Sequence, residues 1–263
     1  MYLEKFNLSG RTALITGGSR NIGLACGEAL AEAGASVIVA DISEELAVSG
    51  RDHLVKAGHK AQAVVLDVTK PADVNAAVDG LVKSNGAIDI LVCNAGIARS
   101  DVPAEEVPDE HWLNVIDVNL NGVFWCCRAA GRHMLAKGKG SIVNVGSMSG
   151  FIVNKPQPQS YYNASKAGVH HLTKSLAAEW AERGVRVNSV APTYIETSLT
   201  KFGMEDERMY PVWLENTPMR RVNRRGPSDC TSRHSGAGGA TKASSGANDI
   251  STAMSCPAAG KAK

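Results

Sequence analysis

Short apolar segments alternate with longer amphipathic segments along most of the chain. The short segments are rich in valine and isoleucine and have strand length, whereas the longer ones repeat apolar residues at helical spacing. The pattern predicts strands over 12–16, 36–40, 61–66, 88–93, 140–145 and 185–190. It predicts helices over 21–33, 43–57, 70–85, 109–135 and 161–183.

This strict alternation predicts an α/β fold built on one doubly wound parallel sheet. The predicted strands are almost continuously apolar, as strands are when helices cover both faces of a sheet. A chain of 263 residues suits a single domain of this class. Ligands of such folds bind at the carboxyl ends of the strands, so functional residues should gather there.

The periodic pattern stops near Val222. Residues 224–263 are mainly glycine, serine, alanine and threonine, and no aromatic residue follows Trp213. Such a segment cannot bury enough apolar surface to offset its ordering entropy, so we expect a folded domain over 1–223 and a disordered tail over 224–263. The tail has six basic and two acidic residues. Without a dense basic cluster or aromatic residues, a solvated tail is favoured over one that binds nucleic acid.

Composition excludes several classes of function. A net charge of +2, with no basic cluster before residue 220, gives no indication of a nucleic-acid partner. The six cysteines show no metal-ligand spacing and lie mostly in apolar runs, which favours buried, reduced thiols over disulfides or zinc. Neither a signal peptide nor a membrane span of roughly 18 apolar residues is recognisable, so we expect a cytoplasmic protein without a membrane partner.

The first strand leads into the first helix through a glycine-rich turn, TGGSRNIG at 16–23. Glycines let the backbone turn tightly and approach a pyrophosphate, which the helix N-terminus stabilises. Asp41 ends the next strand, where a carboxylate can bind both hydroxyls of a ribose and repel a 2′-phosphate. Asp41 could alternatively cap the helix that follows.

Five motifs in the right order make the chain resemble the short-chain dehydrogenase/reductase family, whose fold is of the Rossmann type. They are TGGSRNIG at 16–23, NAG at 94–96, VNL at 118–120, GSMSG at 146–150 and YNASK at 162–166. Within the family, the segment 146–154 followed by PQPQ at 156–159 is most similar to the polyol dehydrogenases and ketose reductases. The resemblance implies that the catalytic residues are Asn119, Ser147, Tyr162 and Lys166.

The resemblance also implies a set of cofactor contacts. Asp67 and Val68 would contact adenine, the NAG turn would line the riboses, and the segment 192–197 would bind the nicotinamide carboxamide. The predicted set is Gly17, Ser19, Arg20, Asn21, Ile22, Gly23, Asp41, Asp67, Val68, Asn94, Ala95, Gly96, Tyr162, Lys166, Pro192, Ile195 and Thr197.

The physical chemistry of Tyr162 and Lys166 agrees with that assignment. Four positions apart on a helix, they share one face. Lowering the pKa of a tyrosine by about 3 units takes roughly 4 kcal/mol, and a cation at about 4 Å supplies about that much at an effective dielectric of 20. Lys166, helped by a positive nicotinamide, would therefore make Tyr162 a base. Tyr161 is the rival, but its partner at the same spacing is the uncharged Ser165.

Other polar residues complete the predicted site. Ser147 would hydrogen-bond the reacting oxygen, and Asn119 would interrupt its helix and hold a water that relays protons past Lys166. Ser149 and Asn154 follow Ser147 closely and suit a substrate with several hydroxyls, so we predict substrate contacts from Ser147, Ser149, Asn154 and Tyr162; alternatively, Ser149 and Asn154 satisfy loop backbone. No metal site is predicted, because His170 and His171 have no ligand-spaced partners.

Some positions depart from the family's pattern. Asn21 replaces the middle glycine of the loop, which asparagine tolerates because it adopts positive φ more readily than other residues. Thr193 replaces the glycine usual after Pro192, which weakens the predicted carboxamide contact. Arg20 is of the type that pairs with the 2′-phosphate of NADP, whereas Asp41 favours NAD. We predict NAD, with NADP possible, since Arg20 can swing into solvent.

The end of the sequence departs furthest from the family's pattern. Relatives continue after 218–222 with a helix and a final strand containing a VDGG-like sequence, and no such sequence follows here. We hypothesise an altered reading frame or a splice variant, which comparison of the three frames of the coding DNA would test. Family members are usually homo-oligomers, but losing these elements would expose a sheet edge and argues against a tetramer.

The leading hypothesis is that the protein transfers a hydride between NAD(H) and the secondary alcohol or ketone of a small polyol/ketose pair. Two alternatives stay open. One is an NADP-dependent carbonyl or 3-oxoacyl reductase, favoured if Arg20 dominates over Asp41. The other is a catalytically silent dinucleotide-binding protein.

Overall fold

The computed structural model describes residues 3–98 and 101–223. The predictions about residues 224–263, a disordered tail in place of the family's final helix and strand, fall outside the described residues. Within them no helix combines the length and apolar character needed to cross a bilayer.

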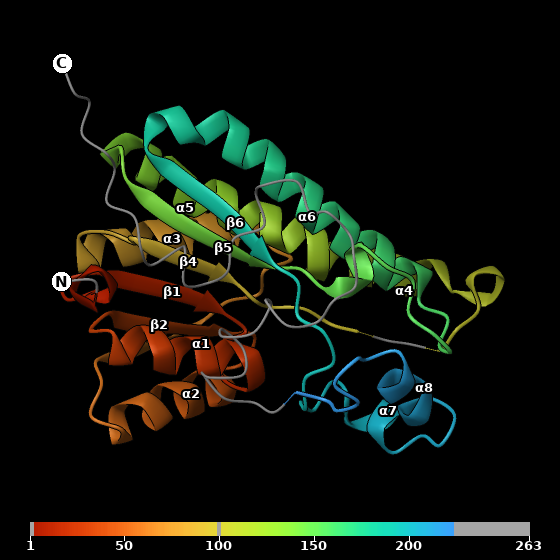
Figure 1. Cartoon of the computed structure of the whole chain (residues 1–263). Helices are drawn as coiled ribbons and strands as arrows, with labels where there is room; N and C mark the ends of the chain where they lie inside the picture. Colours follow the sequence, from red (N-terminus) through yellow and green to blue (C-terminus); the bar gives the residue numbers. More distant parts are fainter. Residues whose placement is uncertain (1–2, 99–100, 224–263) are drawn as a thin grey trace.

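Six parallel strands form one sheet in the order β3-β2-β1-β4-β5-β6. Each predicted strand is present, and only its ends differ by a residue or two. The strands are β1 (Thr12–Thr16), β2 (Ser36–Asp41), β3 (Ala61–Val65), β4 (Ile90–Cys93), β5 (Gly140–Val145) and β6 (Val185–Val190). The chain crosses from one half of the sheet to the other between β3 and β4 (Figure 1). In sheets of this kind, ligands bind in the crevice outside the carboxyl ends of the strands at this point, which here are β1 and β4.

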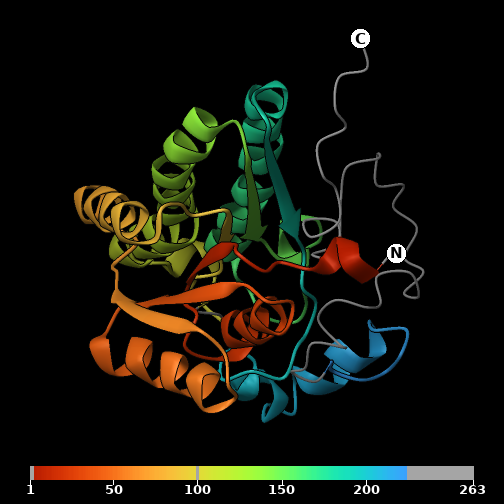
Figure 2. The same ribbon diagram turned by 90° about the vertical axis from the view of Figure 1, so that its left-hand side faces the viewer.

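Helices cover both faces of this sheet, as Figure 2 shows. The helices are α1 (Asn21–Glu32), α2 (Glu44–Lys56), α3 (Pro71–Asn85), α4 (Asp109–Ile116), α5 (Gly122–Lys137) and α6 (Ser160–Trp180). Because side chains alternate along a strand, β1 contributes Leu14 to the core shared with α3, α5 and α6, and Ala13 and Ile15 to the core under α1 and α2. The prediction of a doubly wound fold is confirmed.

The predicted helix over 109–135 is interrupted where it meets the site. A π-helical turn, Asp117–Asn121, joins α4 to α5 without breaking the helical path. Such turns insert one extra residue into a helix and are frequent at functional sites. The expectation that the helix is disturbed at Asn119 is therefore confirmed.

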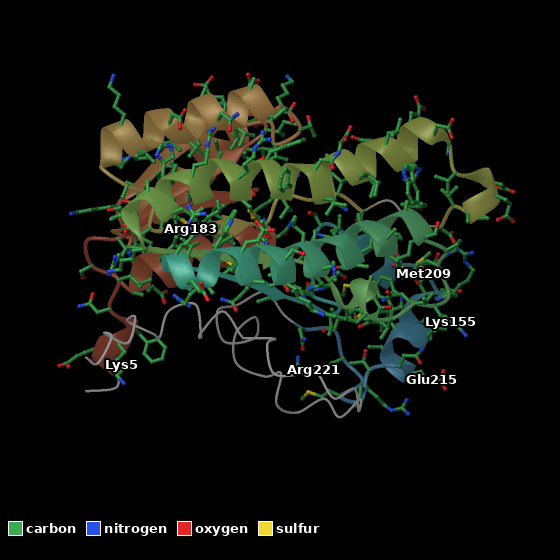
Figure 3. All side chains as sticks on the ribbon, turned by 90° about the horizontal axis from the view of Figure 1, so that it is seen from above. Lys5, Lys155, Arg183, Met209, Glu215 and Arg221 are labelled. Carbon is green, nitrogen blue, oxygen red and sulfur yellow. The ribbon has the colours of Figure 1, made fainter. Side chains whose placement is uncertain are left out.

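Two short helices were not predicted. They are α7 (Lys201–Met204) and α8 (Tyr210–Glu215), and they lie beyond the carboxyl ends of the strands (Figure 1). Seen from above, Met209 and Glu215 lie with Lys155 at this end of the molecule, opposite Lys5 and Arg183 (Figure 3). This segment covers one side of the crevice.

Candidate active site

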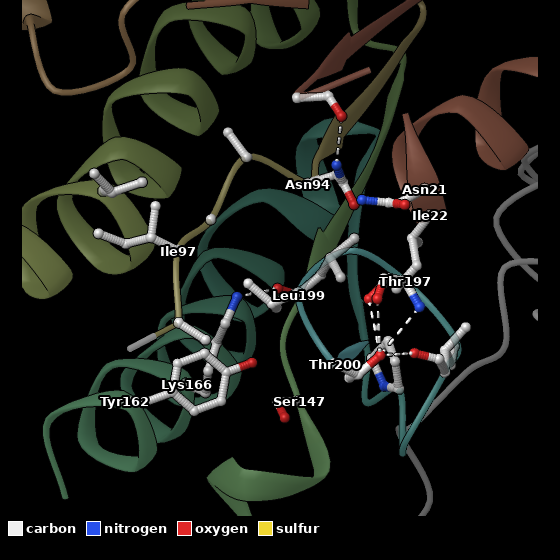
Figure 4. Close-up of a pocket in the computed structure, with 18 of the residues that line it drawn as sticks. Asn21, Ile22, Asn94, Ile97, Ser147, Tyr162, Lys166, Thr197, Leu199 and Thr200 are labelled. Carbon is white, nitrogen blue, oxygen red and sulfur yellow. Dashed lines mark hydrogen bonds between the residues drawn. The ribbon is translucent and has the colours of Figure 1, made fainter. Parts of the chain in front are cut away.

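A cavity of about 500 Å³ opens at the carboxyl ends of the strands. The segments after β1, β2, β3, β4, β5 and β6 all contribute to its wall, as does α6. Of the residues predicted for the site, all but Ser19, Gly23 and Asn119 lie on this wall. Figure 4 shows how some of them face one another across the cavity.

The glycine-rich turn has the close backbone packing that a pyrophosphate site needs. Gly17 has a φ of +60° and Asn21 a φ of +53°, as its replacement of a glycine requires. A Cβ at Gly23 would lie 2.1 Å from the carbonyl oxygen of Gly17, so only glycine fits there. Arg20 caps α1 without a side-chain hydrogen bond, which leaves the amide groups of the helix N-terminus for a ligand in the cavity.

Asp41 points back toward this turn. Its Oδ2 accepts a hydrogen bond of 2.5 Å from the hydroxyl of Ser19, and its Oδ1 accepts one of 2.9 Å from the amide of Ile42. The helix that follows is capped by Ser43, so the alternative of a capping role for Asp41 is wrong. Ser19 thus lies behind the wall and fixes a carboxylate that faces the cavity.

The NAG turn holds the end of β4 against the glycine-rich turn. The side-chain amide of Asn94 donates to the carbonyl oxygens of Thr16 and Gly17, at 3.2 Å and 2.8 Å. The amides of Asn94 and Ala95 both donate to the Thr16 hydroxyl at 3.1 Å. These bonds join the two strands on either side of the crevice, which places Asn94 as a support for the loop as well as a wall residue.

The remaining cofactor candidates lie at the two ends of the cavity. Asp67 accepts hydrogen bonds from the amide and hydroxyl of Thr69, which hold its pKa below the usual range, with a smaller effect from Lys70. At the other end, the amide of Thr197 donates to the hydroxyl of Thr200 at 3.0 Å. Asn21 reaches across to Ser198 with a 2.9 Å hydrogen bond, joining the glycine-rich turn to the segment after β6.

Tyr162 and Lys166 share the inner face of α6 (Figure 4). Lys166 is 4% exposed, and its ammonium donates to the carbonyl oxygen of Val145 at 2.9 Å. Burial lowers the pKa of Lys166 to about 8, so the lysine is still mostly charged at pH 7. Its Nζ lies 5.9 Å from the centre of the Tyr162 ring.

The residues of the chain by themselves do not lower the pKa of Tyr162. Burial raises the pKa of this phenol above its ordinary value, and a hydrogen bond with Ser147 only partly offsets the rise. Desolvation of the phenolate therefore outweighs its stabilisation by the hydrogen bond with Ser147. That Lys166 and a positive nicotinamide together make Tyr162 a base stays a prediction.

Asn119 is completely buried and lies behind Gly96. Its side chain accepts from the amide of Ile97 at 2.8 Å and donates to the Ile97 carbonyl at 2.9 Å and to Ser165 at 3.1 Å. These bonds tie the π-helical turn to the end of β4 and to α6. The side chain of Asn119 is thus committed to holding the site together.

A cluster of polar side chains lines the cavity next to Ser147. Ser149 donates to Asn154 at 2.6 Å, and Asn154 donates to the hydroxyl of Tyr194 at 2.9 Å. Gln159 donates to Ser149 and Asn154, both at 3.3 Å. These described contacts of Ser149 and Asn154 run between side chains, which disfavours the alternative that they serve only loop backbone.

Sequence reasoning missed part of this cluster. Gln157 accepts a 3.1 Å hydrogen bond from Trp213, whose ring stacks on Tyr194 with 4.2 Å between centres. Trp213 comes from α8, an element that was not predicted. In the sequence, the PQPQ segment indicates only a similarity to the polyol dehydrogenases. Its two glutamines, so close to Ser147, were nevertheless a signal for recognition of a polar substrate.

Three features together define a nucleotide-dependent oxidoreductase. They are a glycine-rich turn at a helix N-terminus, a carboxylate that ends the second strand, and a tyrosine–lysine pair beside a serine. The comparisons agree. The model of the family described as short chain dehydrogenase matches residues 11–208.

Three relatives illustrate the similarity. A galactitol 2-dehydrogenase from Rhizobium johnstonii is 51% identical over 226 residues, which cover 84% of this chain and 86% of the relative. A sorbose reductase from Candida albicans is 41% identical over 220 residues, covering 83% of this chain and 78% of the relative. The crystal structure of a gluconate 5-dehydrogenase from Burkholderia cenocepacia in complex with NADP and tartrate has a TM-score of 0.80 and 39% identity, covering 85% of this chain and 87% of that one.

The chain belongs to the short-chain dehydrogenase/reductase family. It is accordingly an NAD(P)-dependent oxidoreductase that acts on CH–OH groups, as the sequence predicted.

Proposed function

We propose that the protein reversibly oxidises a secondary alcohol of a small polyol to a ketose, with NAD as the preferred cofactor. The observation that carries the substrate class is the polar cluster of Ser149, Asn154 and Gln159 beside Ser147 and Tyr162. A buried wall of hydroxyl and amide groups loses hydrogen bonds against an apolar substrate and regains them with a substrate that carries several hydroxyls. Relatives named for galactitol and sorbose support the same class.

The chain's residues have distinct roles in this proposal. Tyr162 takes the proton of the substrate hydroxyl, and Ser147 donates a hydrogen bond to the same oxygen. Lys166 keeps a positive charge under the tyrosine. NAD, held by the glycine-rich turn and the rest of the cavity wall, supplies the hydride acceptor and a positive nicotinamide ring. Asn119 fixes the π-helical turn behind Lys166, and its main chain is the proposed place for a relaying water.

The substrate class is tested by replacing Gln159 with methionine, which has a similar volume and no amide. We expect the KM for galactitol or sorbitol to rise about fivefold, since one hydrogen bond contributes roughly 1 kcal/mol. The rate with propan-2-ol should change by less than about threefold, because that alcohol has no second hydroxyl to bind. The measurement is steady-state NAD reduction with both kinds of alcohol.

Gln62→Met is the matched control, because Gln62 is exposed on β3 and its amide contacts Asn85 outside the cavity. If wild type turns over propan-2-ol as efficiently as polyols, the polyol assignment is wrong. Silence with every alcohol, from protein that still binds NAD, would instead support the catalytically silent alternative.

Cofactor preference is tested at Asp41. We expect wild type to favour NAD and Asp41→Asn to raise kcat/KM with NADP relative to NAD at least tenfold. A carboxylate about 4 Å from a 2′-phosphate costs on the order of 1–4 kcal/mol, and about 1.4 kcal/mol corresponds to tenfold. Asparagine has nearly the same shape without the charge, and it keeps one of the two acceptor oxygens, either the one that accepts from Ser19 or the one that accepts from Ile42.

Asp67→Asn is the control, since its proposed contact with adenine is common to both nucleotides. A wild-type preference for NADP would show that Arg20, which is exposed and lies on the cavity wall, dominates over Asp41. That result would favour the alternative of an NADP-dependent carbonyl or 3-oxoacyl reductase.

A further inference from the structure

His170 lies one helical turn beyond Lys166 on α6 but has no place in the chemistry described so far. Its side chain is 4% exposed and does not line the cavity. A buried imidazole needs partners for both of its nitrogens, because an unpaired polar atom in the interior destabilises the fold. The partners of this imidazole lie in the catalytic loop and in the neighbouring strand.

The main chain of Ser147 is one partner. The Nε2 atom of His170 lies 3.0 Å from the carbonyl oxygen of Ser147 and 3.4 Å from its amide nitrogen. The Nδ1 atom lies 2.8 Å from the hydroxyl of Ser189 on β6. The ring therefore connects the catalytic helix to the catalytic serine on one side and to β6 on the other.

The loop around Ser147 closes over this ring. A Cβ at Gly146 would lie 2.3 Å from Cε1 of His170, and a Cβ at Gly150 would lie 2.7 Å from Cδ2. The Phe151 ring stacks on the imidazole with 4.2 Å between centres and 26° between planes. The two glycines on either side of the serine are thus needed for the loop to fit around the imidazole.

The protonation of His170 follows from the same contacts. Burial lowers its pKa, the hydrogen bond to the main chain of Ser147 opposes this in part, and the charges of Lys166 and Lys174 lower the pKa further, so the ring is neutral at pH 7. The shorter contact of Nε2 is to the carbonyl of Ser147, which favours a hydrogen on Nε2. Nε2–H then donates to Ser147, and Nδ1 accepts from the Ser189 hydroxyl.

We propose that His170 is a positioning residue, which fixes the main chain of Ser147 so that its hydroxyl meets the oxygen bound by Tyr162. The inference rests on the proposed function, because it assumes that Ser147 acts on the substrate. Tyr162, Lys166 and His170 follow one another along α6, so a single helix sets the proton acceptor, its cation and the support of the serine. A displacement of reacting groups by about 1 Å can lower a rate roughly 100-fold, so such a support affects catalysis strongly.

The test compares two substitutions of the same residue. His170→Leu removes both hydrogen bonds and should lower kcat with a polyol by roughly 10- to 100-fold. His170→Gln keeps an N–H donor and an acceptor at similar positions and should stay within about fivefold of wild type. The KM for NAD should be unchanged in both, since His170 is not on the cavity wall. His171→Leu, on the exposed side of α6, is the control.

A double-mutant cycle with Ser147→Ala separates positioning from simple packing. If His170 acts through Ser147, His170→Leu should lower the residual rate of Ser147→Ala by less than about threefold. The same large loss in both backgrounds, or a His170→Gln variant as slow as His170→Leu, would overturn the proposal. Full activity of Ser147→Ala would overturn the role of Ser147 itself, which is a failure of the proposed function and is seen separately.

Ser189→Ala provides a second variant in case His170→Leu does not fold. It leaves the imidazole in place and removes only the hydroxyl at Nδ1. We expect Ser189→Ala to lower kcat about threefold in the wild-type background and to leave it unchanged in the Ser147→Ala background. The reason is that the Ser189 hydroxyl acts on His170, and His170 acts on the reaction only by positioning Ser147. Equal losses in the two backgrounds, or no loss in either, would count against the proposal.

Discussion

Replacing Tyr162 with phenylalanine is expected to lower kcat at least 1000-fold while leaving NAD binding within about twofold of wild type. Proton transfer by a positioned side chain contributes about 10²- to 10⁴-fold. No second group is placed to replace it among the described residues that line the cavity beside Tyr162: Ser147 is a poor base, and Lys166 is mostly charged at pH 7. The measurement is steady-state turnover with a polyol, together with a dissociation constant for NAD.

The pH dependence of the wild-type rate belongs to the same prediction. Burial raises the pKa of Tyr162, so the chain alone does not provide a phenolate near pH 7. The oxidation rate should therefore increase with pH over the range in which the enzyme–cofactor complex loses this proton. The Tyr162→Phe variant should lose that dependence along with its activity.

Tyr161→Phe is the matched control for this substitution. Tyr161 precedes Tyr162 on α6, but its ring packs against His111 of α4 with 4.4 Å between centres, and it does not lie on the cavity wall. Removing its hydroxyl should leave kcat within about twofold, since no described hydrogen bond joins this buried hydroxyl to a residue of the site. If Tyr161→Phe were the inactive variant, the choice between the two tyrosines would be reversed.

The sheet and its helices were predictable because their signal is local. Strands β1, β2 and β4 are almost continuously apolar, and each long helix repeats its apolar residues through several turns, so the sequence pattern indicates both. The interruption at Asn119 was predictable only from the resemblance, because a π-helical turn has no hydrophobic signature. The short helices α7 and α8 have 4 and 6 residues, which is too short for a periodic pattern.

The residues of the candidate site also fall into those that the sequence predicts and those that it does not. Motif residues such as Gly17, Asp41 and Tyr162 could be located because their chemistry requires particular side chains at particular places along strands and helices. Tyr194 and Trp213 could not, because their role depends on stacking between segments that are distant from the catalytic loop in the sequence. The effect of burial on the pKa of Tyr162 could not be predicted for a related reason: a pair distance gives the attraction of a cation, but not the desolvation that opposes it.

Lys166→Met is expected to inactivate the enzyme and, at pH 7, to stabilise its fold. The substitution removes the charge under Tyr162, so we expect kcat to fall about 100-fold or more. The stability of the fold should increase, because the folded chain buries the charge of Lys166 and compensates it poorly. The residue is 4% exposed, and its one described hydrogen bond is to the carbonyl of Val145. Burial lowers the pKa of Lys166 from 10.5 to about 8.

The sign of the effect follows from proton linkage. Between pH 8 and pH 10.5 the unfolded chain binds more protons at Lys166 than the folded chain does, so the free energy of unfolding of wild type rises with pH across this window. Below pH 8 the full cost of the buried charge remains, which is roughly 3 kcal/mol. Losing the hydrogen bond to Val145 offsets about 1 kcal/mol of this.

Denaturant unfolding at pH 7 and at pH 10 therefore distinguishes the outcomes. Lys166→Met should exceed wild type by roughly 2 kcal/mol at pH 7, and the difference should shrink toward zero by pH 10, as wild type sheds the proton on folding. Lys174→Met, on the exposed side of the same helix, should show neither change. A variant less stable than wild type at pH 7 would mean that the charge of Lys166 is well solvated or paired, and that its burial does not destabilise the fold. A gain in the free energy of unfolding that is confined to neutral pH, together with the loss of turnover, would show that the buried charge of Lys166 destabilises the fold but is required for catalysis.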